Sequence, residues 1–297
     1  MLDAITQQNQ YYEAIKRTFR RIAGRIFPKA FFKWSQSAQR SHASWFIGDP
    51  TYVLTFEIDR REEIEALPRV LDILARYGIL AGFSCSGELI DRYPELFKRA
   101  VSEGHELINR AYFLEGEGRA HRSADKAALI DEIVRCHRAC EGAIGYRMVG
   151  FRMPHLCFPD GEIYAFLRKL NYSYSSSTFA VNTRAWGLPY PESCGILEVP
   201  ISPTAGGASC APNASFFFKN QRGRQPDAFK ENFVETIDLI ARLGSFATHR
   251  FYPSDVVEGE EIEFMCASLA DKRARNGLRL TTYRDFLDCI WKECYLF

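Results

Sequence analysis

Tyr52-Val-Leu-Thr-Phe-Glu-Ile-Asp59 is an apolar run that ends in two acids, and the rest of the sequence is organised around it. Its period-2 alternation predicts a β-strand with apolar residues on one face and Glu57 and Asp59 on the other. Carboxylates at the end of a buried strand need partners, because desolvating an unpaired charge costs several kcal/mol. Either the strand runs into solvent, where its acids pair with arginines such as Arg60, or the carboxylates stand at the mouth of a catalytic barrel.

Strand and helix patterns alternate regularly from this run to the end of the chain. About eight strands with intervening helices indicate a parallel sheet covered by helices. Their number favours a distorted (β/α) barrel of about seven or eight mostly parallel strands over an open sheet. The predicted strands are 52–59, 79–85, 105–112, 148–153, 172–177, 196–201, 245–251 and 278–282. The predicted helices are 62–77, 88–102, 123–141, 161–170, 227–243, 260–275 and a closing helix to about residue 294.

The overall composition excludes several classes of protein. A net charge of +1 gives no general attraction to nucleic acid. Nine cysteines without a framework spacing indicate reduced thiols rather than a disulfide scaffold. No long apolar segment suggests a membrane span, and the N-terminus lacks the apolar core of a signal peptide. We therefore expect a cytoplasmic protein.

The N-terminal segment has an unusual composition. Residues 10–35 alternate apolar and basic side chains at helical spacing and end in aromatic residues, which predicts a basic amphipathic helix. A polar linker is expected over 35–44, so we divide the chain into an N-terminal helix with its linker (1–44) and one domain (45–297). The helix could pack across one end of the domain, rest peripherally on anionic lipids at the inner face of the membrane, or bind a partner protein.

Two long loops, residues 182–195 and 203–226, interrupt the alternation of strands and helices. They are rich in Gly, Pro, Ser and Asn but also carry aromatic residues such as Trp186. Long loops in compact domains are often functional, and exposed aromatic rings suit sugar rings. We predict substrate contacts from Trp186, Tyr174 and His155.

Polar side chains recur at the carboxyl ends of the predicted strands, where barrel enzymes carry their active sites. They include two acids, several arginines and a histidine, which suffices for general acid–base hydrolysis. The residues that we expect to act there are Glu57, Asp59, Arg110, Arg152 and His249.

The order of these segments resembles the polysaccharide deacetylases of the NodB-homology type, over roughly residues 50 to 290. The stretches that carry the resemblance are Thr55-Phe-Glu-Ile-Asp59, Gly104-His-Glu-Leu-Ile-Asn-Arg-Ala-Tyr-Phe-Leu114, Phe151-Arg-Met-Pro-His155, Asn171-Tyr-Ser-Tyr-Ser-Ser-Ser177 and Thr248-His-Arg-Phe-Tyr-Pro253. The resemblance implies the TIM-barrel-like fold of that family. It also implies that Glu57 is the catalytic base, Arg152 the residue that orients it, and His249 the general acid.

The resemblance also implies a zinc or cobalt ion, which is held by an aspartate and two histidines and activates water. This sequence has Ile58, Arg110 and Leu114 at those positions, so we predict no metal cofactor. Asp59 could replace one ligand, and His121 could join it from the following loop. Arg110 could instead supply the missing positive charge and polarise a carbonyl, or simply form an ion pair in a dead site.

The sequence therefore predicts an amide hydrolase of deacetylase type. It would remove an acetyl or formyl group from an amino sugar or a sugar-linked glycolipid, without the usual metal triad. Glu57 would activate water, with Arg152 and Asp59 positioning it, Arg110 stabilising the oxyanion and His249 protonating the amine. The alternative is a catalytically inactive relative that binds carbohydrate or acts as a regulator. The sequence gives no oligomeric state.

Overall fold

The computed structural model describes most of the chain. The described residues are 18, 22–23, 26–42, 49–113, 126–156, 159–180, 183, 186–192, 194–205, 226–258 and 260–294. Leu114, His121 and most of the predicted loop 203–226 lie outside them. So does much of the predicted N-terminal helix.

Nine strands form one sheet, and ten α-helices and one short 3₁₀ helix are described with them. The strands are β1 (Thr51–Ile58), β2 (Gly82–Cys85), β3 (Glu106–Asn109), β4 (Gly150–Phe151), β5 (Tyr174–Ser175), β6 (Tyr190–Pro191), β7 (Leu197–Glu198), β8 (Phe246–Phe251) and β9 (Arg279–Thr281). The helices are α2 (Pro28–His42), α3 (Arg61–Tyr77), α4 (Gly87–Arg92), α5 (Pro94–Ser102), α6 (Lys126–Ile144), η1 (Pro154–Leu156), α7 (Gly161–Lys169), α8 (Pro226–Leu243), α9 (Pro253–Glu258), α10 (Glu261–Asn276) and α11 (Tyr283–Cys294).

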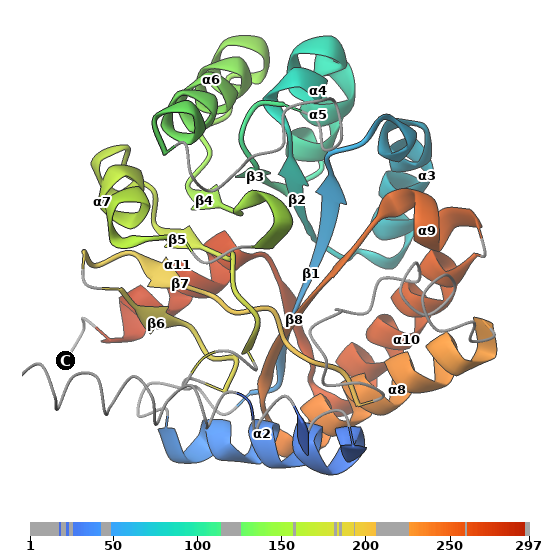
Figure 1. Cartoon of the computed structure of the whole chain (residues 1–297). Helices are drawn as coiled ribbons and strands as arrows, with labels where there is room; N and C mark the ends of the chain where they lie inside the picture. Colours follow the sequence, from blue (N-terminus) through green and yellow to red (C-terminus); the bar gives the residue numbers. More distant parts are fainter. Residues whose placement is uncertain are drawn as a thin grey trace, which may run out of the picture.

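The sheet curls into an incomplete barrel with helices around its outside (Figure 1). The strand order is β6-β7-β5-β4-β3-β2-β1-β8, and every pairing is parallel except that of β6 with β7. β8 runs along one edge of β1, so β9 and β2 must share its other edge, beside its beginning and its end respectively. The predicted distorted (β/α) barrel is confirmed.

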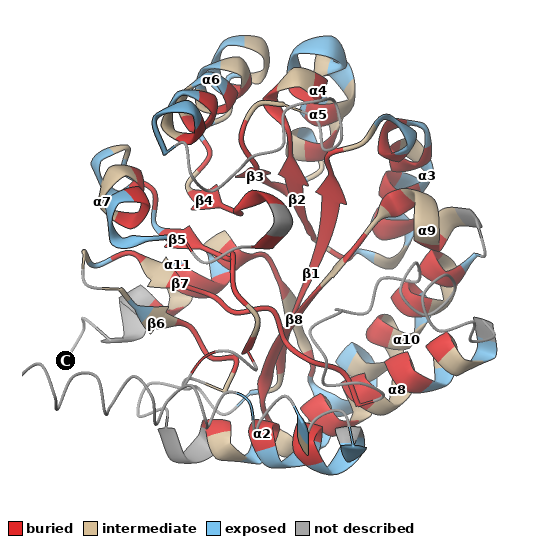
Figure 2. Ribbon diagram, viewed as in Figure 1, coloured by how far each residue is buried: buried red, intermediate tan, exposed pale blue. Residues whose placement is uncertain are grey.

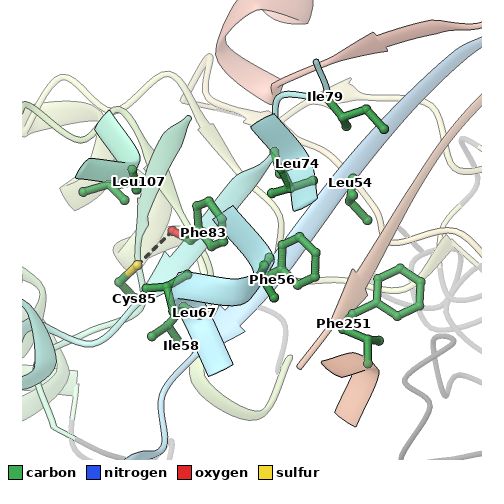
Figure 3. Close-up of a cluster of buried hydrophobic side chains, with 14 of the residues drawn as sticks. Leu54, Phe56, Ile58, Leu67, Leu74, Ile79, Phe83, Cys85, Leu107 and Phe251 are labelled. Carbon is green, nitrogen blue, oxygen red and sulfur yellow. Dashed lines mark hydrogen bonds between the residues drawn. The ribbon is translucent and has the colours of Figure 1, made fainter. Parts of the chain in front are cut away.

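β1 divides the core into an outer and an inner layer. Its residues Leu54, Phe56 and Ile58 are fully buried against the surrounding helices, in the cluster that Figure 3 shows. The ring of Phe56 stacks on that of Phe83 from β2, with centroids 5.5 Å apart. The alternate residues of β1 point into the barrel. All eight residues of the strand are buried, so Figure 2 shows it entirely in the colour of buried residues.

The barrel interior is polar near the starts of its strands. Tyr174 donates a hydrogen bond to Glu106 Oε1 (2.7 Å), and the backbone N–H of Arg284 donates to Glu106 Oε2 (3.1 Å). Burial raises the pKa of Glu106 to about 7, although these hydrogen bonds lower it. Near pH 7 Glu106 is therefore partly protonated in the folded state, whereas it would be ionised in the unfolded chain.

Helix α2 covers the end of the barrel where the strands begin (Figure 1). Gln39 accepts a hydrogen bond from the backbone N–H of Phe246 (2.8 Å) and donates to the carbonyl of the same residue (2.9 Å). The helix continues to His42, through most of the stretch 35–44 for which the sequence predicts a polar linker. Gln39 finds buried partners in the domain, and Ser35 donates to the Phe32 carbonyl of its own helix (2.8 Å).

Two further elements differ from the sequence-based expectation. The helix predicted over 88–102 is split into α4 and α5, because Pro94 lacks an N–H and begins a new helix. The short antiparallel strand β6 lies inside the predicted loop 182–195. A two-residue strand that contains proline has no sequence pattern by which it could be recognised.

Gly150 is required by a close approach of Tyr174. A Cβ atom on Gly150 would lie 2.1 Å from the Tyr174 ring, whereas Gly161 has no neighbouring atom within 4 Å. We expect Gly150→Ala to destabilise the fold by roughly 1–3 kcal/mol through overpacking. Gly161→Ala is the matched control and should unfold at the wild-type urea concentration or above it. Equal midpoints for the two variants would contradict this packing argument.

Glu106 makes stability depend on pH. Because its folded pKa of about 7 exceeds its ordinary value of 4.5, its contribution is fully present below pH 4.5 and is lost as pH rises through 7. This change amounts to roughly 3 kcal/mol. Urea unfolding at pH values on either side of this window should show Glu106→Gln losing less stability than wild type as pH rises. Parallel losses in the two proteins would assign the effect to other groups.

Candidate functional site

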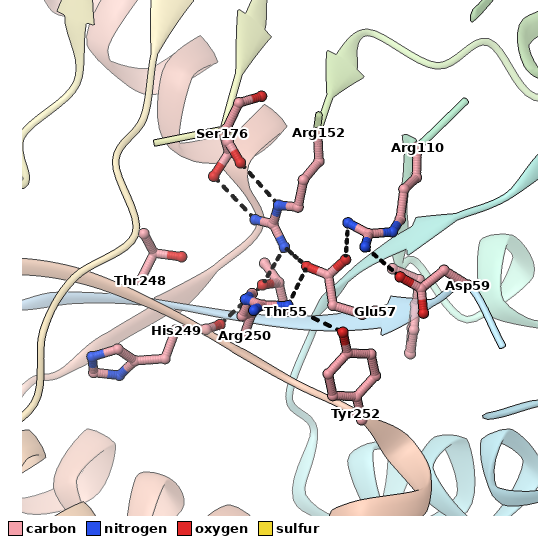
Figure 4. A network of polar contacts seen from close by, with 12 residues as sticks. Thr55, Glu57, Asp59, Arg110, Arg152, Ser176, Thr248, His249, Arg250 and Tyr252 are labelled. Atoms are coloured by element: carbon pink, nitrogen blue, oxygen red, sulfur yellow. Dashed lines mark hydrogen bonds and ion pairs between the residues drawn. The ribbon is translucent and has the colours of Figure 1, made fainter. Parts of the chain in front are cut away.

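Glu57 lies at the carboxyl end of β1 with both carboxylate oxygens bound by arginines (Figure 4). Arg152 Nη1 contacts Oε1 at 2.8 Å, and Arg110 Nη1 contacts Oε2 at 2.7 Å. Arg250 Nη1 approaches Oε1 to 3.8 Å. Glu57 and Arg152 are fully buried, and Arg110 is 3% exposed. The predicted acid at the end of this strand is thus the centre of a buried ionic network.

Arg152 is held by residues of β1, by Ser176 directly after β5 and by Tyr283 of α11. Its Nε and Nη2 donate to the carbonyl and the hydroxyl of Ser176, each at 3.0 Å. Nη1 also donates to Thr55 Oγ1 (3.0 Å), and Nη2 also donates to the hydroxyl of Tyr283 (3.0 Å). A guanidinium has five N–H donors in a rigid plane, and here β1, β5 and α11 supply acceptors around it. Arg152 therefore holds Glu57 in one position.

Arg110 joins the two acids of the opening sequence motif. Its Nη1 contacts Glu57, and its Nη2 forms an ion pair with Asp59 Oδ2. The next residue, Ala111, has a φ of 67°, a left-handed conformation that costs energy for any residue other than glycine. The Ala111 N–H donates to Asn109 Oδ1 (2.8 Å), which supports this turn. The backbone thus bends sharply directly after Arg110.

The network keeps Glu57 ionised. Burial alone would raise the pKa of Glu57, but the guanidiniums of Arg110, Arg152 and Arg250 outweigh it and lower that pKa to about 2. Its contribution to stability is therefore present above its ordinary pKa of 4.5 and is lost as pH falls through about 2. The two carboxylates face three guanidiniums, so the centre carries an excess of positive charge.

Arg250 and Tyr252 border this network and were not among the predicted site residues. Arg250 Nη1 donates to the Tyr252 hydroxyl (3.4 Å), and the guanidinium of Arg60 lies 4.1 Å from the Tyr252 ring. Burial raises the pKa of Tyr252 to about 12, so its hydroxyl is protonated at neutral pH. Both residues are partly exposed, unlike Glu57. Alternation along β8 places Arg250 on the face of Thr248, opposite to His249, but does not say which face points inward.

His249 does not join the predicted site. It faces the helices on the outside of the sheet, where its Nδ1 contacts the Tyr52 hydroxyl (2.9 Å) and its Nε2 contacts the Pro203 carbonyl (3.0 Å). Figure 4 shows its ring turned away from Glu57. Burial lowers the pKa of His249 to about 4. The expected general acid is thus on the wrong face of β8, because neighbouring residues of a strand point in opposite directions.

The three expected substrate contacts do not gather at Glu57 either. Tyr174 is buried toward the strand starts, on Glu106. Trp186 packs against Trp34 of α2, with ring centroids 4.3 Å apart, at the opposite end of the barrel. His155 lies in η1 shortly after Arg152, and its side chain is outside the described residues. Of the eight predicted residues, Glu57, Asp59, Arg110 and Arg152 come together.

The described residues do not fit a divalent metal at this centre. Ile58 points into the hydrophobic core, and the Arg110 guanidinium lies between the carboxylates of Glu57 and Asp59. A metal ion there would face a like charge and would find no imidazole ligand among the side chains that the structure describes. Within the part of the chain that the structure describes, no three His, Cys, Asp or Glu side chains form a group that could hold a metal ion.

The Asp59–Arg110 pair should show strong energetic coupling. Removing one partner of a buried ion pair costs roughly 3–5 kcal/mol, because it leaves a buried charge uncompensated. We expect Asp59→Asn and Arg110→Met each to lower the unfolding free energy by about this much. The double variant should lose much less than the sum.

The exposed pair Arg76–Glu263, at 2.9 Å, provides the control cycle. Exposed pairs couple by only about 0.2–1 kcal/mol. Additive losses at Asp59 and Arg110 would contradict a closed ion pair.

Comparison with known proteins finds similarity to one family over part of the chain. A model of the polysaccharide deacetylase family matches residues 48–175. A peptidoglycan-N-acetylglucosamine deacetylase from Bacillus cereus is 36% identical over 59 residues, which are 20% of this chain and 21% of that protein. The matched segments span about a third or less of the length of the curated relatives.

Solved structures share the fold at low identity. A protein described as a polysaccharide deacetylase from Mycobacterium smegmatis superposes with a TM-score of 0.69 and 17% identity, over 84% of this chain and 93% of that one. A CE4 family pseudoenzyme from Bacillus anthracis gives 0.52 and 15%, over 80% and 65%. The matched residues 48–175 contain β1 to β5 with Glu57, Arg110 and Arg152, and this part of the chain is similar to the polysaccharide deacetylase family.

Proposed function

We propose that this protein binds a carbohydrate at the Glu57 centre without hydrolysing it. The observation that carries the proposal is the double clamp on Glu57, whose Oε1 and Oε2 each contact a buried guanidinium. A base that activates water needs a free oxygen and a pKa near the working pH. Both oxygens of Glu57 contact guanidiniums, and its pKa is about 2.

The position of His249 also supports binding over hydrolysis. An amide is cleaved only when its departing amine receives a proton, and His249 was the expected donor. Its two ring nitrogens contact Tyr52 and Pro203 instead, on the far side of β8. In the folded protein the expected acid, His249, therefore does not lie beside the expected base, Glu57.

The class of ligand follows from the family and from the charge of the centre. Relatives include a peptidoglycan-N-acetylglucosamine deacetylase, so an amino sugar is the first ligand to consider. Arg250 and Tyr252 are partly exposed at the border of the network, and both could donate hydrogen bonds to sugar oxygens. The excess of guanidiniums favours a sugar that carries a carboxylate or a phosphate.

A second candidate is amide hydrolysis in which Arg110 replaces the metal. Arg110 Nη1 lies 2.7 Å from Glu57 Oε2 and could stabilise an oxyanion that forms beside this carboxylate. Loss of such a donor typically costs roughly 3–4 kcal/mol of transition-state stabilisation. For this reaction Glu57 would have to exchange Arg110 for water when substrate binds.

A panel of N-acetyl and N-formyl amino sugars, with and without acidic groups, tests the proposal. We expect no release of free amine by the wild-type protein, and heat of binding with an acidic amino sugar in calorimetry. Arg250→Gln should weaken that binding roughly tenfold, as expected for one charge-assisted contact. Arg69→Gln, on the exposed side of α3, is the matched control and should bind as wild type.

Release of amine by the wild-type protein would overturn the binding proposal in favour of hydrolysis. Arg110→Lys, which keeps the positive charge, would then be compared with Arg110→Met for kcat at matched folded fractions. A larger loss of kcat in Arg110→Met would assign the oxyanion role to this residue.

A further inference from the structure

Helix α2 and the residues before it present an unusual apolar surface. Five large hydrophobic side chains are exposed in the described part of the chain, and four of them lie here: Ile22 (50%), Ile26 (62%), Phe27 (66%) and Trp34 (51%). We call these four residues with Lys33 the α2 outer face. Single exposed apolar residues are ordinary, but a cluster marks an interaction surface.

The attachment of α2 to the domain uses Trp34 of this face, which packs against Trp186. On the opposite side of the helix Phe31, Phe32, Gln36 and Gln39 are buried. At 100° per residue, Lys33 and Trp34 lie on a different side of α2 from these four positions, and Ile22, Ile26 and Phe27 precede the helix. Hydrogen bonds from Phe27 to Ala23 (2.8 Å) and from Phe31 to Phe27 (2.9 Å) keep the helical spacing across Pro28.

The charge of the segment indicates what the face binds. Between Glu13 and Asp49 the chain has eight lysines and arginines and no acid, although the net charge of the whole protein is only +1. Lys29 contacts Glu235 at 2.9 Å and is still 70% exposed, so it adds to the charge that faces solvent. Basic and apolar side chains together match a surface that is anionic outside and apolar beneath.

We propose that the α2 outer face docks on an anionic lipid bilayer. Ile26 and Phe27 would enter the boundary between headgroups and acyl chains, Trp34 would lie at headgroup level, and Lys33 would contact lipid phosphates. No helix of the described chain is both long enough and apolar enough to cross a membrane. The helix would therefore lie parallel to the surface.

The attachment of α2 to the barrel sets the orientation of the docked protein. Gln39 ties α2 to Phe246, where β8 begins, whereas Glu57 lies where β1 ends. Figure 1 shows α2 at the end of the barrel from which β1 points away. Docking through the α2 outer face would thus direct the Glu57 centre away from the bilayer, toward glycans that extend from the surface.

Co-sedimentation of the full chain with vesicles tests this proposal. We expect binding to phosphatidylcholine vesicles that contain phosphatidylglycerol, little binding to phosphatidylcholine alone, and release by salt. Phe27→Ser should weaken partitioning roughly tenfold or more, because it removes an inserted aromatic side chain. Lys33→Gln should weaken it about fivefold.

Matched controls separate the face from general stickiness. Tyr93→Ser removes the other exposed large hydrophobic residue, and Lys98→Gln removes an exposed lysine of α5. Both should sediment as wild type. Equal binding to charged and neutral vesicles, or wild-type binding by Phe27→Ser, would overturn the proposal. So would a dimer in light scattering that Phe27→Ser dissociates, combined with no vesicle binding, because a second copy would then cover the face.

Discussion

The contact between Glu57 and Arg152 is the constraint on which the barrel interior depends. A carboxylate with no solvent exposure is tolerable only if charged partners replace the water that it has lost. Arg152 meets this need and brings Thr55, Ser176 and Tyr283 with it, from three different elements. The network therefore fixes the relative positions of β1, β5 and α11 at the carboxyl end of the sheet.

Arg110 extends the network to Asp59 and changes the chemistry of the centre. The family resemblance implies a metal ion beside these residues, whereas here a guanidinium contacts both carboxylates. A guanidinium cannot give up its proton in a protein and cannot accept a water molecule as a ligand. The centre therefore keeps a positive charge next to the carboxylates, and the proposed recognition of an acidic sugar rests on that charge.

The sequence predicts much of the fold because strand and helix periods are local properties. The faces of β1 follow from alternation alone, and the pairing of Glu57 with arginines follows from the cost of burying an acid. His249 and Arg250 are adjacent polar residues at one strand end, and only the register of β8 against β1 decides which faces inward. Tyr174 and Trp186, predicted as substrate contacts, make internal contacts instead. An aromatic side chain suits a buried contact as well as a sugar, and composition does not distinguish the two.

The contact between Gln39 and Phe246 has a consequence for the open side of the barrel. β8 is the last strand of the sheet path, and its outer edge would otherwise present free backbone groups. The Gln39 amide bonds both backbone groups of Phe246 as a neighbouring strand would, and Ser202 does the same for Thr248 two residues later. Such capping blocks edge-to-edge pairing between molecules, the usual origin of β-aggregation. Removal of the first 42 residues would expose that edge at Phe246. Helix α2 therefore protects the sheet edge, in addition to the membrane contact proposed for its outer face.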